Sequence, residues 1–107
     1  MTLHYLGFDF SENAEGDGTG SFDALASVDA AHVDHVRDEI AIVLDWARTE
    51  YPGIEAALED GGDWQHDLQV LTEHAGARQL TTFSLTLAGT AAFCDALRHR
   101  FPEAQLD

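Results

Sequence analysis

Two segments of the chain share one pattern, and this internal repeat restricts the fold more than any other feature. Residues 20–51 and 81–102 each contain an alternating strand pattern, a short cap and an amphipathic helix that ends in aromatic-Pro. Their anchor residues align at a constant offset, so that Phe22 matches Phe83. The repeat predicts the order strand-strand-helix, twice. A chain of 107 residues is the size of one domain, with repeat units of about 1–53 and 63–107.

Four segments alternate between apolar and polar residues, as half-buried strands do. The expected strands span residues 3–10, 21–28, 64–71 and 80–87. Alternation in all four indicates that one face of the sheet meets solvent, which is typical of antiparallel sheets. We therefore expect an α+β fold of the order β-β-α-β-β-α, a two-layer sandwich with two helices on one face of a mainly antiparallel sheet. Leu25 and Leu71 fall on the solvent face, where they are able to extend a partner surface. The strand order stays open.

The first helix is expected to begin after the N-cap Asp29 and to end near Tyr51. Its apolar residues recur at helical spacing and form one stripe: Val33, Val36, Ile40, Val43, Leu44, Ala47 and Tyr51. The second helix is expected from Ala91 to about Phe101, after a cap at Gly89-Thr90.

Ile42 and Trp46 lie roughly opposite the apolar stripe and four residues apart, so they are expected on one outer face of the first helix. An exposed apolar pair with a polar rim is typical of a binding patch, and Trp is common at the energetic centre of interfaces. The rim would consist of His35, Asp38, Glu39 and Thr49. The carboxylates of Asp34, Asp38, Glu39 and Asp45 would steer the approach of a partner. In the alternative, Ile54 and Leu58 fold back and cover Trp46 within the same chain.

Charge is the abnormal part of the composition. Twenty acidic residues oppose five basic ones, all of them arginine, which gives a net charge of −15. Nucleic acid and anionic membranes are poor partners for such a chain, because phosphate binding requires cationic side chains. A basic protein partner or a cation is favoured instead. The alternative is that the acidity only supports solubility or reflects a salt-rich cytoplasm.

The residues offer little support for catalysis or for a cofactor. His35 and Glu39 have the spacing of a helical metal pair, but the sequence fixes no third ligand, and we expect no metal and no cofactor. The acidic loop at residues 9–20 lacks the glycine and the final glutamate of a calcium loop. Cys94 falls near the buried side of the second helix and is expected to act as a small hydrophobic residue.

Together these patterns predict a small, acidic, non-catalytic interaction protein that binds a basic protein or itself as a homodimer, in the manner of an inhibitor, an immunity factor or a regulator. The alternative is a ligand-binding or metal-binding domain, or a small enzyme, that uses His35 with Asp38 or His66 with His74. The single cysteine and the lack of a leader or a membrane-spanning apolar run predict a cytoplasmic protein.

Overall fold

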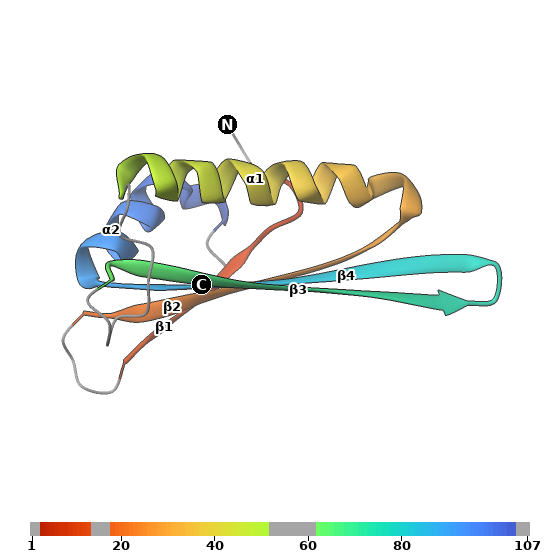
Figure 1. The fold of residues 1–107 in the computed structure, drawn as a ribbon, viewed down its shortest axis with the longest axis horizontal. Coiled ribbons are helices and arrows are strands. Elements are labelled where there is room, and N and C mark those ends of the chain that lie inside the picture. The colour runs from red at the N-terminus through yellow and green to blue at the C-terminus, as the bar shows by residue number, and fades with distance from the viewer. Residues whose placement is uncertain (1–2, 14–17, 52–61, 105–107) are drawn as a thin grey trace.

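The chain folds into one antiparallel sheet with two helices on one side of it (Figure 1). The computed structural model describes residues 3–13, 18–51 and 62–104. The strands are β1 (Phe8–Glu12), β2 (Gly20–Asp29), β3 (Trp64–Ala75) and β4 (Arg78–Gly89), in the spatial order β1-β2-β4-β3. The helices are α1 (Val33–Glu50) and α2 (Ala91–Arg100), with 3-10 turns at Ala30–His32 and Pro102–Ala104. The predicted α+β class, with a four-stranded antiparallel sheet and two helices, is confirmed.

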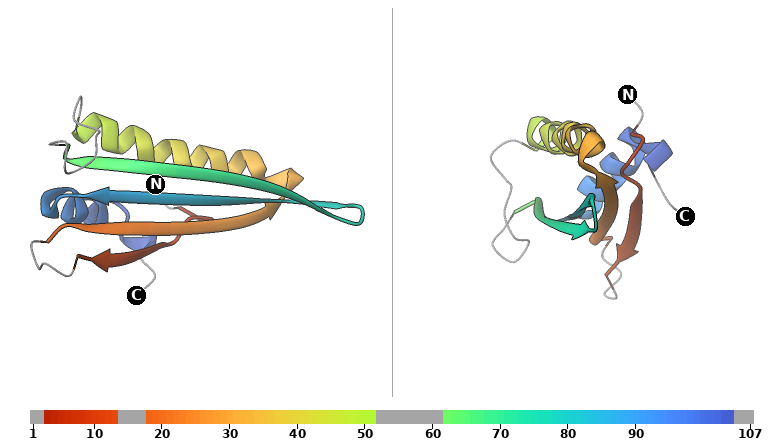
Figure 2. Two further views of the ribbon diagram at one scale, coloured as in Figure 1. Left: turned by 60° about the horizontal axis from the view of Figure 1, so that its bottom comes forward. Right: turned by 90° about the vertical axis from the view of Figure 1, so that its right-hand side faces the viewer.

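The core lies between the sheet and the helices, on the face that the alternation predicts. Phe22 on β2 and Phe83, Leu85 and Leu87 on β4 are all buried. On α1 the buried apolar residues are those of the expected stripe: Val36, Ile40, Val43, Leu44 and Ala47. Figure 2 shows α1 and α2 covering the same face of a strongly twisted sheet, while the other face is open. Leu25, on the open face, has 68% of its surface exposed.

The hairpin formed by β3 and β4 is longer than the alternation indicates. β3 continues to Ala75 instead of ending near residue 71, and its twelve residues pair with β4 without interruption. A two-residue turn closes the hairpin, and only Gly76 in it has a positive φ, of 65°, as in a type II′ turn. Because β2 pairs only as far as Leu80, the tip of the hairpin extends beyond the rest of the sheet (Figure 1).

The first strand begins later than expected, and a buried carboxylate explains why. Residues 3–7 are not part of the sheet, since β1 starts at Phe8. The backbone N–H groups of His4, Tyr5 and Leu6 instead donate hydrogen bonds to the Glu39 carboxylate, at 2.8, 2.9 and 3.1 Å. Backbone donors held in this way cannot pair with a neighbouring strand. The segment therefore crosses to α1 and places Leu3 and Leu6 in the core.

The two helices begin in different ways. Asp29 was expected to cap α1 directly, but α1 starts at Val33, after the 3-10 turn. The Asp29 carboxylate lies 2.7 Å from Nδ1 of His32, and this hydrogen bond lowers the pKa of Asp29. At α2 the expected cap is present: Oγ1 of Thr90 accepts a hydrogen bond from the backbone N–H of Phe93 at 3.3 Å.

Glycine allows α2 to lie close to the sheet. Gly20 and Gly89 are partners on β2 and β4, and Trp64 on β3 continues the same row. A Cβ at Gly89 would collide with the Phe93 ring. The Phe93 ring stacks on the Trp64 indole with the ring centres 5.6 Å apart and the planes 6° apart. Gly89 thus makes room for the aromatic contact that fixes α2.

No helix in the described ranges is both long and apolar enough to cross a membrane. The sequence also predicts a short turn at residues 54–58 and a break at residues 60–63 after the first helix, and residues 54–58 and 60–61 lie outside the described residues.

We expect Glu39→Ala to lower the free energy of unfolding by about 2–3 kcal/mol, because it leaves three partly or fully buried N–H groups without an acceptor. Glu39→Gln keeps one acceptor oxygen and should lose less. Urea denaturation at neutral pH measures both values. A change of less than about 0.5 kcal/mol in Glu39→Ala, the size typical of an exposed substitution, would contradict this role.

Candidate interaction surface

Ile42 and Trp46, the predicted centre of a binding patch, pack against the core instead of standing free on α1. The Trp46 ring lies 5.9 Å from the ring of Phe93 and 5.7 Å from that of Phe101, measured between ring centres. Both side chains are half-buried. Residues 54 and 58, which were considered as a cover for Trp46, lie outside the described residues. The cover that the structure shows comes from α2 and from the residue that follows it.

The predicted rim and steering residues do not form one surface. Only 7% of the surface of Glu39 is exposed, and its carboxylate binds the N-terminal segment. It is therefore not a surface charge that could attract a partner. His35 is exposed, with its ring centre 6.2 Å from that of Tyr5 in that segment. Asp38 and Asp45 are also exposed, and Asp45 lies on the flank of α1 that faces β3. Binding of a partner by the exposed members of this set stays a prediction.

The histidines considered for catalysis or metal binding are not brought together. His66 and His74 are eight residues apart on β3, a separation of about 26 Å in an extended strand. His66 stacks on the buried Trp64 at 6.0 Å. Within the described ranges, no group of three or more His, Cys, Asp and Glu side chains has a metal-binding arrangement.

Cys94 is buried on α2, as the sequence predicts. Its Sγ lies 3.6 Å from the carbonyl oxygen of Gly89 and 3.8 Å from that of Gly20. Burial raises the pKa of the thiol, so that the neutral form dominates at neutral pH. A buried neutral thiol is a weak nucleophile, and Cys94 acts as a packing residue.

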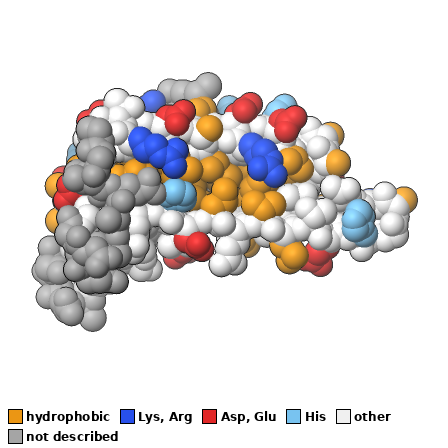
Figure 3. Space-filling view, in the orientation of Figure 1, with side chains coloured by type: hydrophobic (Ala, Val, Ile, Leu, Met, Phe, Trp, Pro, Cys, Tyr) orange, Lys and Arg blue, Asp and Glu red, His pale blue; other side chains and the backbone are white. Residues whose placement is uncertain are grey.

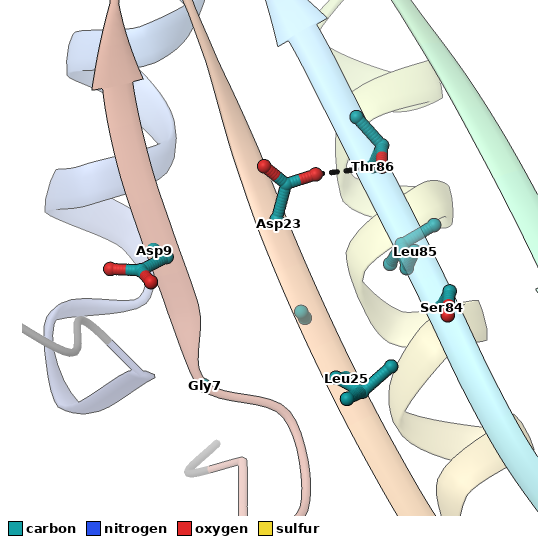
Figure 4. A pocket seen from close by; sticks show the side chains of 8 residues that line it. Gly7, Asp9, Asp23, Leu25, Ser84, Leu85 and Thr86 are labelled. Carbon is teal, nitrogen blue, oxygen red and sulfur yellow. Dashed lines mark hydrogen bonds between the residues drawn. The ribbon is translucent and has the colours of Figure 1, made fainter.

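The open face of the sheet carries two carboxylates on neighbouring strands. Asp9 on β1 and Asp23 on β2 are directly opposed partners, and both are exposed. Figure 4 shows Asp23 turned toward β4, where it accepts a hydrogen bond from Thr86 at 2.8 Å, and Asp9 turned the other way. Both residues border an open hollow of about 310 Å³, together with Leu25 and Ser84. Like charges directly opposed across strands destabilise a sheet, so this pair has a cost for the fold.

The edge strand β3 carries most of the exposed large hydrophobic residues of the described ranges. Of the four large hydrophobic residues that are exposed in the described ranges, three lie on β3: Leu68, Val70 and Leu71. Its register with β4 places Leu68 opposite Leu85 and Val70 opposite Phe83, so both point to the helix side of the sheet. Both side chains nevertheless remain exposed, and Leu68 lies beside α1. β3 is also an unbroken strand at the edge of the sheet, and no strand of the described residues pairs with its outer side. Such an edge pairs readily with another chain.

A groove runs between α1 and β3 above these residues. It has a volume of about 220 Å³, with Phe83 and Leu68 on the sheet side and Ile40 and Leu44 on the helix side. Hydrophobic side chains are visible along this band in Figure 3, below two cationic side chains. Arg37 and Arg48 line the groove, and the Arg37 guanidinium lies 5.4 Å from the centre of the Phe83 ring.

Comparison of the chain with models of protein families, with curated proteins and with solved structures finds no match.

The alternation in β3 correctly predicts that Leu68 and Val70 point to the helix side of the sheet. It does not predict that they are exposed there, because exposure depends on the position of β3 at the edge. Which strand lies at the edge cannot be deduced from that pattern, and a central strand would have the same alternation. The opposition of Asp9 and Asp23 likewise depends on the register of β1 with β2.

We expect Trp46→Ala to lower the free energy of unfolding by about 2–3 kcal/mol, somewhat less than a fully buried Trp would. The reason is the loss of its contacts with Phe93 and Phe101. Asp38→Ala, on the same helix but exposed, is the matched control and should change the value by less than about 0.5 kcal/mol. Thermal and urea unfolding measure both. Equal, small effects of the two substitutions would mean that Trp46 is a surface residue after all.

Proposed function

We propose that this chain is a non-catalytic interaction protein that binds a basic protein partner on the open face of its sheet. The observation that carries this proposal is the pair of opposed carboxylates, Asp9 and Asp23, beside the most exposed leucine of the described residues. A folded chain that keeps two like charges in opposition accepts a loss of stability. Such local conflicts are characteristic of functional surfaces.

A lysine or arginine side chain fits this hollow chemically. Its cationic group would meet the carboxylates that border the hollow and offset their negative charge, while its methylene stem would pack on Leu25. Ser84 and Thr86 border the hollow and offer hydroxyl groups for further hydrogen bonds. The binding mode is therefore electrostatic at its centre, with an apolar contact at one side.

The net charge of −15 acts at longer range on the same partner. Acidic surfaces attract basic proteins and increase their rate of association at low salt. At 0.1 M salt, ions screen the attraction between charges that are more than about 10 Å apart. The role that fits best is that of an inhibitor, an immunity factor or a regulator, for which binding itself is the activity.

The same proposal includes the internal repeat, the layer arrangement and the cellular compartment of the chain. We take the units of about 1–53 and 63–107 as a pseudo-repeat that forms a two-layer sandwich, and the reducing cytoplasm as the compartment that suits the lone thiol of Cys94. The sheet order supports this arrangement, because the second strand of each unit lies at the centre and the first at an edge.

We expect the double variant Asp9→Asn/Asp23→Asn to weaken binding of an oligoarginine peptide about tenfold, which corresponds to about 1.4 kcal/mol. The same variant should raise the free energy of unfolding by roughly 0.2–1 kcal/mol, because the like-charge pair is removed. Fluorescence anisotropy measures the first quantity, and urea denaturation the second. A lower affinity for the peptide together with a higher free energy of unfolding is the result expected of a functional carboxylate pair.

Asp38→Asn/Asp95→Asn is the matched control, because it changes the net charge equally at two exposed helical positions. It should reduce the affinity less than about twofold. If both double variants weaken binding to the same extent, only the total charge matters, and the hollow is not the site.

A further inference from the structure

Five exposed residues form a stripe along the flank of α1 that faces β3. They are Asp34, Arg37, Ala41, Asp45 and Arg48, and their spacing of three or four residues places them on one side of the helix. All of them except Asp34 line the groove, opposite Leu68 and Phe83. The stripe contains two acids and two bases, so it is neutral within a chain of net charge −15.

The order of charges in the stripe is self-complementary. Ala41 is its centre, with Arg37 and Asp45 four residues to either side and Asp34 and Arg48 seven residues to either side. When two copies of α1 meet antiparallel about a two-fold axis near Ala41, each acid faces a base. Arg37 then faces Asp45 of the second copy, and Asp34 faces Arg48 of the second copy. A small central residue also permits a close approach of the two helices.

The edge strand β3 is also self-complementary when it pairs with a second copy in one particular register. An antiparallel pairing of two β3 strands about Gln69 places Leu68 opposite Val70 of the second copy, on the helix side of the sheet. In this register, Asp67 faces Leu71 of the second copy. A pairing about Val70 would instead bring Asp67 opposite Glu73 of the second copy, and like charges opposed across strands are unfavourable.

We propose that the flank formed by α1 and β3 is a two-fold interface with a second copy of this chain. The two β3 edges would join the sheets into one continuous sheet and satisfy their free backbone groups. Leu68 and Val70 of both copies would form an apolar cluster below the two stripes. The same patch on both molecules makes the contact isologous and closed.

Charge favours a second copy over a basic protein at this flank. Two chains of −15 repel each other at long range, so they can approach only where the local charge is balanced. The stripe provides such a region, with two of the five arginines of the chain. A basic partner would gain little from a surface that holds as many arginines as acids. The inference goes beyond the proposed function and does not depend on it, because the hollow at Asp9 and Asp23 lies on the opposite face of the sheet.

The test is a charge exchange across the axis, followed by the solution mass. Light scattering or sedimentation equilibrium at about 0.15 M salt, where long-range repulsion is screened, should give twice the chain mass of 11.7 kDa. Arg37→Asp and Asp45→Arg should each raise the dimer dissociation constant at least about tenfold, since each places like charges together twice in the dimer. The double variant Arg37→Asp/Asp45→Arg restores opposite charges and should restore the dimer.

A second pair of variants separates the interface from the fold. Leu68→Gln should weaken the dimer, whereas Leu25→Gln, at the most exposed apolar residue of the open face, should leave the mass unchanged. Circular dichroism confirms that each variant is folded. A monomeric mass for the unmodified chain overturns the proposal, and so does a double variant that stays as dissociated as the single ones. Asp9→Asn/Asp23→Asn should keep the dimer, so that failure of this proposal and failure of the hollow are distinguishable.

Discussion

A buried carboxylate determines how the chain is arranged around α1. Glu39 is the only charged side chain buried in the described ranges, and a charge in that position is tolerated only when it is hydrogen-bonded. Its three partners are backbone N–H groups of one short segment, His4 to Leu6, so the bond positions a length of chain and not a single side chain. That segment gives Leu3 and Leu6 to the core and keeps the first strand short. The arrangement leaves β1 with five residues and α1 with one covered flank.

The two flanks of α1 consequently differ. One flank packs against α2 and the N-terminal segment, where Trp46 meets Phe93 and Phe101 and where Tyr5 meets His35. The other flank lies beside β3 and is open, and it is the flank that carries the alternating charges around Ala41. The flank beside β3 and the outer side of the helix, where Asp38 is exposed, are therefore the parts of α1 that can meet another molecule. The open sheet face, with Asp9 and Asp23, provides a separate direction.

The periodic part of the fold can be predicted from the sequence, and the part that depends on pairing cannot. Alternation in β2 and β4 and the apolar stripe of α1 are local patterns, and the structure confirms both. The sequence predicts an exposed Trp46 because the helical periodicity of α1 marks only the side that faces the sheet. A second side of α1 is also partly buried, because Trp46 packs against Phe93 and Phe101. Glu39 has the sequence context of an exposed acid, because its partners are backbone groups more than thirty residues away, which no side-chain pattern marks. The opposed carboxylates depend on strand register, which the sequence pattern leaves open.

The two edges of the sheet are unequal, and this inequality limits the size of any assembly. The outer edge at β3 has twelve residues, whereas that at β1 has five and carries Asp9 and Glu12. A chain with two long free edges can add copies at both and grow into a fibre. In the proposed pair, the joining of two β3 edges would use the longer of the two sheet edges in the described part of each copy, and the β1 edges that remain would be short and negatively charged. Growth would then terminate at a pair, and the strand that carries three of the four exposed large hydrophobic residues would be the one least able to start a fibril.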